Sequence, residues 1–282
     1  MKAFSIVIPA YNEAAVVGDC IRGLLDQQGI DELEIVVVPN GCHDDTAEVA
    51  RGFGERVKVI ELEEGSKVNA LNAGDAACTL FPRAYVDADI ELSPECLIRC
   101  HEALAGGLLA VAPRAEFVRE HSGFIIRSFY DCWERTPYFA DGHMIGSGFY
   151  AMSEEGRSRF TEFPPIIADD GFAHTLFDRG ERMTVEGCSF RIHAPRSIRG
   201  LIAIKTRERL GSIELKAKGY LPREREPEGT TFGSMFANLL RHPISSVIYT
   251  ALRIITRTRA ARQARKRIFH IWERDESARE AR

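Results

Sequence analysis

The chain opens with a short apolar run that a proline closes, Phe4-Ser5-Ile6-Val7-Ile8-Pro9. Such a run predicts a buried strand, and the helical spacing of the apolar residues that follow predicts a helix from Asn12 to about Gln27. The same two patterns then alternate along the chain. We expect further strands at residues 34–38, 57–60 and 83–86, and helices that start near Asp44, Ser66 and Ser93.

This β-α-β order implies a mostly parallel sheet with helices on both faces. Ligands of such sheets bind beyond the carboxyl ends of the strands. Polar segments follow the first, second and fourth expected strands, at residues 10–13, 40–45 and 87–89. We expect these segments to meet at one edge. No glycine-rich phosphate loop follows the first strand, which argues against a dinucleotide dehydrogenase or a P-loop NTPase.

Two carboxylate pairs stand out. Asp87-Ala88-Asp89 follows a predicted strand, and two carboxylates at this spacing can hold a hard divalent cation that in turn holds a diphosphate. Surface turns also produce this pattern, so the surrounding motifs must decide between a metal site and a surface turn. Asp169-Asp170 precedes a predicted helix, where the alternative is an acid pair that complements the helix dipole.

The composition is that of an ordinary globular protein, with 282 residues, 45% hydrophobic and 28% charged. Its seven cysteines are scattered without a C-x-x-C motif, which fits packing roles in a reducing compartment. No signal peptide and no apolar run of about 18 residues is visible. We therefore expect a cytoplasmic protein, and with a net charge of −4 we expect no nucleic-acid partner.

The C-terminal region differs from the rest. Residues 241–267 hold eight Lys or Arg and no Asp or Glu, and apolar residues repeat at helical spacing over 232–240 and 244–255. This pattern fits helices that lie on an anionic membrane surface, at the inner face of the cell membrane. The alternative is a helix pair docked on the domain itself or on a second subunit in a homodimer.

Five segments together resemble family 2 glycosyltransferases, which have the GT-A fold. They are FSIVIPAYNE (4–13), IVVVPNGCHDDT (35–46), GSKVNALNAG (65–74), YVDAD (85–89) and ADDGFAHTLFDRG (168–180). They occur in the family's order and spacing, and the resemblance covers about residues 3–215. It implies an α/β fold with a Rossmann-like, mostly parallel sheet. It also implies inverting transfer of a hexosyl-type sugar from a nucleoside diphosphate, with UDP or GDP expected, to an acceptor hydroxyl.

The resemblance also implies a domain division. Residues 1–217 would form the glycosyltransferase domain, with the nucleotide-binding half at 1–92 and the acceptor and catalytic half at 93–217. Beyond the region of resemblance, the charged segment 218–231 with its prolines is expected to be a linker, and the apolar repeats and basic residues predict an amphipathic helical tail at 232–282.

The resemblance assigns residues to the donor and to a Mg²⁺ or Mn²⁺ ion. Asn40 stands where relatives commonly carry an Asp that binds the base, and an amide can still read an imide edge. Asp89 would ligate the metal, with Asp87 at the ribose or the metal's water shell and His193 as a further ligand. The nucleotide-sugar residues would be Pro9, Ala10, Tyr11, Glu13, Asn40, Lys67, Asp87, Ala88 and Arg209.

In this family the second acid of the Asp169-Asp170 pair reaches the acceptor hydroxyl, which makes Asp170 the expected general base. Two adjacent carboxylates should raise one another's pKa. The segment Thr206-Arg207-Glu208-Arg209-Leu210 has the outline of the Gln-x-x-Arg-Trp motif of processive members. Thr and Leu replace Gln and Trp, which argues against processive polymer synthesis, but the Arg209 guanidinium still suits a pyrophosphate.

The acceptor is expected along the aromatic-rich segment 121–150, with Trp133 and His143 as candidate contacts and with Gly146 and Ser147 beside the donor sugar. A carbohydrate, a lipid-linked sugar and a small metabolite all remain open as acceptors, and a role in cell-envelope polysaccharide synthesis would fit. Two other functions remain as alternatives. One is a non-catalytic, membrane-docked scaffold that binds nucleotide sugars, and the other is a nucleotidyltransferase on a similar fold.

Overall fold

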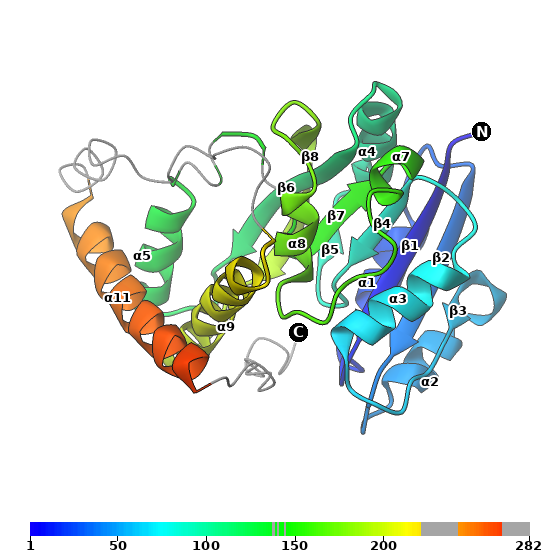
Figure 1. Cartoon of the computed structure of the whole chain (residues 1–282). Helices are drawn as coiled ribbons and strands as arrows, with labels where there is room; N and C mark the ends of the chain where they lie inside the picture. The colour runs from blue at the N-terminus through cyan, green and yellow to red at the C-terminus, as the bar shows by residue number, and fades with distance from the viewer. Residues whose placement is uncertain (137–138, 140, 144, 221–241, 267–282) are drawn as a thin grey trace.

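The computed structural model describes residues 1–136, 139, 141–143, 145–220 and 242–266 (Figure 1). Its strands are β1 (Ala3–Ala10), β2 (Glu32–Pro39), β3 (Lys58–Val59), β4 (Arg83–Val86), β5 (Glu91–Leu92), β6 (Ala110–Val118), β7 (Phe149–Met152) and β8 (Arg182–His193). Its helices are α1 (Val17–Leu25), α2 (Thr46–Arg51), the 3₁₀ turn η1 (Gly54–Arg56), α3 (Lys67–Ala77), α4 (Cys96–Ala105), α5 (Phe124–Trp133), α7 (Glu154–Arg157), α8 (Asp169–Thr175), α9 (Ile198–Ala217) and α11 (Pro243–Arg265). The expected strands at 34–38, 57–60 and 83–86 are confirmed as β2, β3 and β4.

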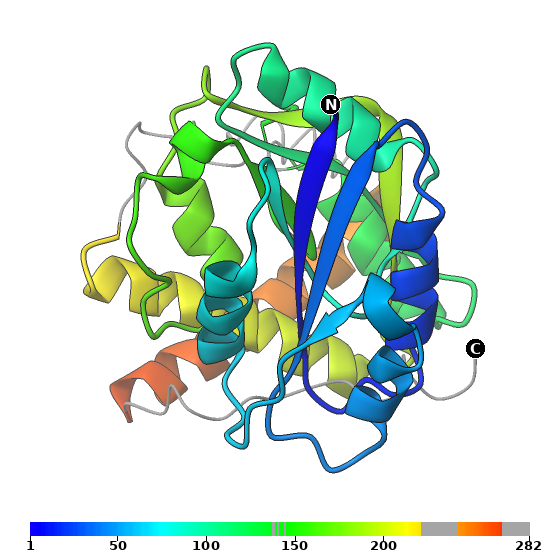
Figure 2. The same ribbon diagram turned by 90° about the vertical axis from the view of Figure 1, so that its right-hand side faces the viewer.

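The strands form one sheet of eight in the order β3-β2-β1-β4-β7-β6-β8-β5. The first four in this order are parallel, as the β-α-β pattern predicts. β7 then pairs antiparallel with both β4 and β6, and β5 pairs antiparallel with β8. Figure 2 shows α3 on one side of β1 and β2, with α1 and α2 on the other. The carboxyl ends of β1, β2 and β4 therefore open at one edge, flanked by helices.

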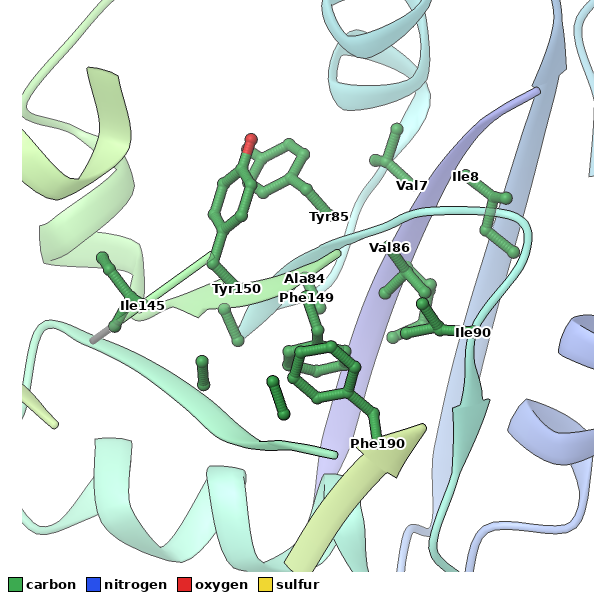
Figure 3. Close-up of a cluster of buried hydrophobic side chains, with 14 of the residues drawn as sticks. Val7, Ile8, Ala84, Tyr85, Val86, Ile90, Ile145, Phe149, Tyr150 and Phe190 are labelled. Carbon is green, nitrogen blue, oxygen red and sulfur yellow. The ribbon is translucent and has the colours of Figure 1, made fainter. Parts of the chain in front are cut away.

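Part of the core lies under this edge, where side chains of β1, β4, β7 and β8 pack together. Figure 3 shows side chains such as Val7, Val86, Phe149 and Phe190, all buried, meeting between these strands. The rings of Tyr85 and Tyr150 stack at 5.1 Å between centroids, which joins β4 to β7 across the sheet. Close-packed aromatic side chains of this size hold the strand ends rigidly, so the loops that follow start from fixed positions.

The first helix departs from expectation. α1 begins at Val17 rather than at Asn12, because Asn12 has a left-handed backbone with φ of 51°. Asparagine tolerates this conformation better than most residues. Its side-chain oxygen accepts a hydrogen bond from the His43 backbone N–H at 2.8 Å. The segment after β1 is therefore tied to the segment after β2, and it forms a loop at the sheet edge rather than a helix start.

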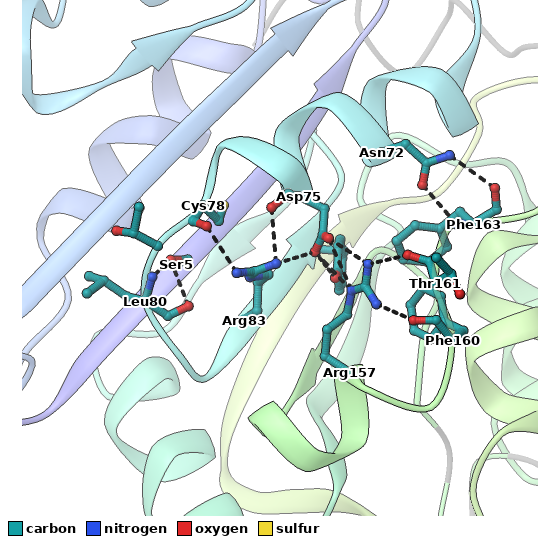
Figure 4. A network of polar contacts seen from close by, with 12 residues as sticks. Ser5, Asn72, Asp75, Cys78, Leu80, Arg83, Arg157, Phe160, Thr161 and Phe163 are labelled. Atoms are coloured by element: carbon teal, nitrogen blue, oxygen red, sulfur yellow. Dashed lines mark hydrogen bonds and ion pairs between the residues drawn. The ribbon is translucent and has the colours of Figure 1, made fainter.

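A buried polar network joins α3 to β4 and α7 (Figure 4). The carboxylate of Asp75 on α3 accepts hydrogen bonds from Arg83 at 2.8 Å, from Arg157 at 2.7 Å and from the Tyr85 hydroxyl. Burial opposes ionisation of this carboxyl, but the hydrogen bonds from Arg157, Tyr85 and Arg83 outweigh it and hold the pKa of Asp75 below its usual value. The network fixes α3 against the sheet at a point where Gly and Ala leave little side chain to pack.

Helices α5, α9 and α11 form a separate group at one end of the molecule (Figure 1). α11 packs on α5 and α9 through its buried residues Ser246, Tyr249, Leu252, Thr256 and Ala260. Docking on the chain's own surface, one of the two alternatives for the tail, is therefore correct for α11. The expected apolar repeat at 232–240 and most of the linker fall outside the described residues. Within the described part of the chain, no helix is long and apolar enough to cross a membrane.

Candidate active site

A large cleft of about 1580 Å³ opens at the carboxyl edge of the sheet and runs on between the helices α5, α9 and α11. Most of the residues expected at the site line it: Pro9, Tyr11, Glu13, Asn40, Lys67, Asp87, Ala88, Asp89, Trp133, Ser147, Asp169, Asp170, His193 and Arg209. Residues from loops that are far apart in sequence thus meet in one concavity. Ala10, His143 and Gly146 are expected site residues that do not line it.

Lys67 joins the two carboxylate pairs. Its ammonium lies 2.9 Å from Asp87 Oδ1 and 3.0 Å from Asp169 Oδ1. Burial alone would lower the pKa of this lysine, but the Asp169 and Asp87 carboxylates outweigh burial and raise the pKa above its usual value. Lys67 is therefore a permanent cation at the centre of the cleft. Ser66 holds it there by capping α3, since the Ser66 hydroxyl accepts the backbone N–H of Asn69.

Asp169 and Asp170 begin helix α8, as the sequence predicts, but their surroundings differ. The side chain of Asp169 is only 5% exposed and accepts the Tyr150 hydroxyl at 3.1 Å. Burial, with Asp170 and Asp87 adding and Lys67 opposing, raises the pKa of Asp169. Asp170 is more exposed, and its two oxygens accept the backbone N–H groups of Gly171 at 2.7 Å and Ser147 at 3.2 Å. Its carboxylate is thus oriented by the backbone and open to the cleft.

Gly146 lies directly against Asp170 and does not line the cleft. A Cβ atom at this position would lie 2.9 Å from the Cβ of Asp170, and the backbone φ of +114° is one that only glycine adopts readily. The small-residue segment expected beside the donor sugar therefore divides into two roles. Gly146 makes room for Asp170, and Ser147 lines the cleft.

Helix α9 also positions the acid pair. The carboxylate of Glu214, which is buried in α9, accepts the backbone N–H of Ile167 at 2.8 Å. This bond fixes the loop directly before Asp169. Glu214 was not among the residues expected from sequence, because its role depends on how α9 packs against a loop almost fifty positions away.

Asn40 has a structural role that the sequence did not suggest. Its amide nitrogen donates to the carbonyls of Ala10 at 2.8 Å and Val38 at 3.2 Å, and its amide oxygen accepts the Ser66 N–H at 3.0 Å. Both amide hydrogens and the oxygen thus have backbone partners, and the side chain is 3% exposed. Asn40 therefore cross-links the loops after β1 and β2 to the start of α3, and recognition of a base by its amide stays a prediction.

The metal candidates lie in the cleft but are spread over two strand ends. Asp87 and Asp89 follow β4, and His193 ends β8 with its Nε2 at 3.1 Å from Glu91 Oε1. That ring nitrogen is therefore already engaged, and metal ligation by His193 stays a prediction. Among the residues that the structure describes, no three His, Cys, Asp or Glu side chains gather as a closed metal cluster.

The far part of the cleft has a floor of aromatic side chains. Trp133, an expected acceptor contact, packs with Phe117, Phe129, Tyr130 and Phe139. His143, the other expected acceptor contact, does not line the cleft. Its Nδ1 lies 3.2 Å from the carbonyl of Arg182, and its own carbonyl accepts from that arginine, so these bonds hold it against β8 outside the cleft lining.

Lys205 on α9 was missed by sequence analysis. It is 8% exposed, and its ammonium lies 3.2 Å from the centroid of the Trp133 ring and within 3.0 Å of both Glu208 oxygens. Burial lowers the pKa of Lys205, and the Glu208 carboxylate opposes this shift. The i, i+3 pairing of Lys205 and Glu208 is visible in the sequence, but its position over Trp133 follows only from the packing of α9 on α5.

Comparison with known proteins agrees with this arrangement. The family model described as "Glycosyl transferase family 2" matches residues 5–157. A curated relative, 4,4'-diaponeurosporenoate glycosyltransferase of Staphylococcus aureus, is 28% identical over 199 residues, which are 66% of this chain and 49% of that protein. The chain thus spans about half the length of the curated relatives it matches.

Two solved structures share the fold. The mannosyltransferase PcManGT of Pyrobaculum calidifontis, in complex with GDP-Man and Mn²⁺, has a TM-score of 0.61 at 20% identity, covering 96% of this chain and 81% of that one. Glucosyl-3-phosphoglycerate synthase of Mycobacterium tuberculosis, with Mn²⁺ and UDP-glucose, has a TM-score of 0.54 at 21% identity, covering 81% and 85%. At these identities the likeness concerns the fold.

Proposed function

We propose, from the premise that this chain belongs to glycosyl transferase family 2 and has its GT-A fold, that it is an inverting, metal-assisted enzyme whose general base is Asp170. The donor would be a nucleoside diphosphate sugar and the acceptor a hydroxyl group. One observation carries the proposal. Four charged residues from three separate segments meet in one cleft. Lys67 forms ion pairs with Asp87 and Asp169, and Asp170 is the residue next to Asp169 in the sequence.

The proposed reaction is a single displacement. The acceptor oxygen forms a bond to the anomeric carbon while the bond from that carbon to the diphosphate oxygen breaks. The acceptor proton passes to a carboxylate oxygen of Asp170, and the bonding electrons leave with the diphosphate. Asp170 suits this role because two backbone N–H groups fix its orientation and because it is the more exposed member of the acid pair.

Asp169 and Lys67 would organise the donor end. The Lys67 ammonium between Asp87 and Asp169 can meet the negative charge that develops on the leaving diphosphate. Asp169 is too enclosed to reach an acceptor, and its bonds to Tyr150 and Lys67 give it a positioning role. Pro9, Tyr11 and Glu13 line the cleft beside the β1 end, where the base and ribose would lie.

The residues present fit a divalent cation in part. Asp87 and Asp89 offer the hard carboxylate oxygens that Mg²⁺ and Mn²⁺ prefer, and the described residues hold no cluster that would complete the shell. A cation here would therefore take most of its ligands from a diphosphate and from water. When bound, it would neutralise charge on the leaving group. The two structural neighbours that contain Mn²⁺ and a nucleotide sugar support this proposal.

A thermal-shift experiment tests donor binding. UDP, GDP, dTDP, CDP and ADP are each added with and without Mn²⁺, and one of them is expected to stabilise the chain only with the metal. At a hundredfold excess over its dissociation constant the gain is about 2.7 kcal/mol, or roughly 5 °C or more in melting temperature.

The Asp89→Asn variant should lose the metal-dependent part of this shift. The matched control is Asp26→Asn, an exposed carboxylate at the end of α1 that lies outside the cleft lining. A metal-dependent shift that Asp89→Asn leaves intact would remove Asp89 from the metal site. No shift with any nucleotide would count against the donor proposal and equally against a scaffold that binds nucleotide sugars.

We also propose that α11 lies against an anionic membrane surface. Its inner face is docked on α5 and α9, but its outer face exposes apolar side chains, with Ile244 and Val247 each 62% exposed. Phe124 at the start of α5 is 66% exposed and extends the apolar surface available at this end of the molecule. Arg262 and Arg265 lie about four and five turns beyond Val247 on the same side of α11, which suits anionic lipids.

Replacing Ile244 and Val247 together with Gln is expected to weaken binding to anionic vesicles by at least about tenfold, since each buried side chain of this size is worth about 1.5–3 kcal/mol. Vesicle flotation measures the effect. The control is Met183→Gln, which removes an exposed apolar side chain on β8. Equal flotation of the double variant and the parent chain would rule out this face as the contact.

A further inference from the structure

The far wall of the cleft carries arginines that the proposed reaction does not use. Arg209 on α9 and Arg253 and Arg257 on α11 all line it. Figure 1 shows α9 between α8, which starts with the acid pair, and α11. The cleft therefore continues past Asp170, along α9, to a wall that the C-terminal helix supplies.

These arginines differ from the other cations of the cleft. Lys67 is paired with Asp87 and Asp169, and Lys205 is paired with Glu208. Arg209, Arg253 and Arg257 have no carboxylate within salt-bridge distance among the residues that the structure describes. Arg253 instead donates a hydrogen bond to the neutral Tyr249 hydroxyl at 2.7 Å.

All three arginines line the same cleft, and the positive charges of Arg253 and Arg209 act on Arg257. The Arg253 guanidinium, together with burial and the charge of Arg209, lowers the pKa of Arg257 below its usual value. Like charges gathered on the wall of a concave site focus a positive potential into it. Such an arrangement is unfavourable in the empty protein, and a bound anion would relieve it.

We propose that Arg209, Arg253 and Arg257 form a binding site for a phosphate group of the acceptor. This inference rests on the proposed transferase function and narrows its acceptor class. One bidentate arginine is enough for a carboxylate, whereas three guanidinium groups match the charge and the several oxygens of a phosphate. The donor diphosphate has its own cation in Lys67, so Arg209 is reassigned here from the donor to the acceptor.

A path joins this site to the proposed base. The charge of Asp170 is one of those that act on the Lys205 ammonium, and this ammonium lies over the ring of Trp133. The ring of Phe129 then contacts that of Tyr249 at 5.2 Å between centroids, and Tyr249 lies beneath Arg253. An acceptor whose hydroxyl is at Asp170 and whose phosphate is at the arginines would lie along this aromatic floor.

The experiment titrates the full chain with inorganic phosphate in the presence of saturating Mn²⁺ and the nucleoside diphosphate that binds best. The nucleotide occupies the donor site, so any further rise in melting temperature reports a second anion site. Arg253→Gln and Arg257→Gln are each expected to weaken phosphate affinity about tenfold or more, while the nucleotide shift stays unchanged. Arg253→Lys keeps the positive charge but loses the planar guanidinium with its several donors. Its phosphate affinity should lie between that of the parent chain and that of Arg253→Gln.

Arg199→Gln is the matched control, because Arg199 is exposed on α9, the helix that carries Arg209, and lies outside the lining of the cleft. Equal phosphate affinity in the parent chain, Arg253→Gln and Arg257→Gln would overturn the proposal. A failure of the donor proposal has a different signature, since the nucleotide shift is then absent. Phosphate is in that case titrated without nucleotide, and the arginine variants still decide the outcome.

A second pair of probes identifies the source of the phosphate. Glycerol phosphate represents soluble acceptors, and hexadecyl phosphate in neutral detergent micelles represents lipid-linked ones. Ile254 lines the cleft beside the arginines and is 60% exposed. Tighter binding of hexadecyl phosphate that Ile254→Gln reduces would assign a lipid phosphate, and equal binding of the two would assign a soluble one. Binding of neither probe would contradict the site.

Discussion

Replacing Asp170 with Asn is expected to slow sugar transfer by about 10³-fold and to leave nucleotide binding unchanged. The amide cannot take the acceptor proton, and the nucleotide site at Lys67 and Asp87 is not altered. The substitution also has a local cost. Both carboxylate oxygens accept backbone N–H groups, from Gly171 and Ser147, and an amide can accept only one of these bonds. The variant's melting temperature must therefore be measured beside its activity.

The measurement is single-turnover transfer from the donor that the thermal-shift screen identifies, together with the nucleotide shift of the same variant. Asp26→Asn again serves as the control, because it makes the same change on an exposed helix end. Transfer at the parent rate in a folded Asp170→Asn chain would remove Asp170 from the mechanism. Loss of both transfer and nucleotide binding would instead indicate that the substitution disturbs the whole site.

Replacing Asp75 with Asn is expected to lower the free energy of unfolding by about 3–5 kcal/mol. Arg83 and Arg157 are both largely buried, with side chains 9% and 12% exposed, and they share this one carboxylate. The substitution leaves two enclosed positive charges without their compensating negative charge. Chemical denaturation measures the effect, with Asp26→Asn as the control that should stay within about 0.5 kcal/mol of the parent.

The same carboxylate predicts a pH dependence. Hydrogen bonds hold the pKa of Asp75 below its usual value of 3.8, so its contribution to stability is complete above that value. The contribution is lost as the pH falls from about 3.8 through the lower folded pKa. The difference in stability between the parent chain and Asp75→Asn should therefore be largest near neutral pH and should shrink in acid. A difference that stays constant down to pH 3 would contradict the assignment.

Local patterns predicted the first half of the fold well, because a buried parallel strand needs a continuous apolar run that a short sequence window reveals. β1, β2, β3 and β4 all lie within about two residues of expectation. The order of β7, β6, β8 and β5 could not be predicted, since antiparallel and parallel pairs between distant segments depend on tertiary packing. Asn12 illustrates a smaller failure, where a left-handed residue turned an expected helix start into a loop.

The candidate site divides in the same way. Lys67, Asp87 and the Asp169-Asp170 pair directly follow strands or begin helices, so their chemistry and their position could be inferred together. Asn40 has the right position but a structural role, which only its three backbone hydrogen bonds reveal. Lys205, Arg253 and Arg257 could not be found from sequence, because they reach the cleft only through the packing of α9 and α11 on α5.

The contribution of α11 to the cleft has an evolutionary consequence. The family model matches residues 5–157, so the α9 and α11 walls lie outside the matched segment. Substitutions on α11 can change what the far wall recognises without disturbing Lys67, Asp87 or Asp89. Selection could then act on acceptor choice and donor chemistry as separable traits. Exchanging α11 between relatives would be a direct way to retarget such an enzyme.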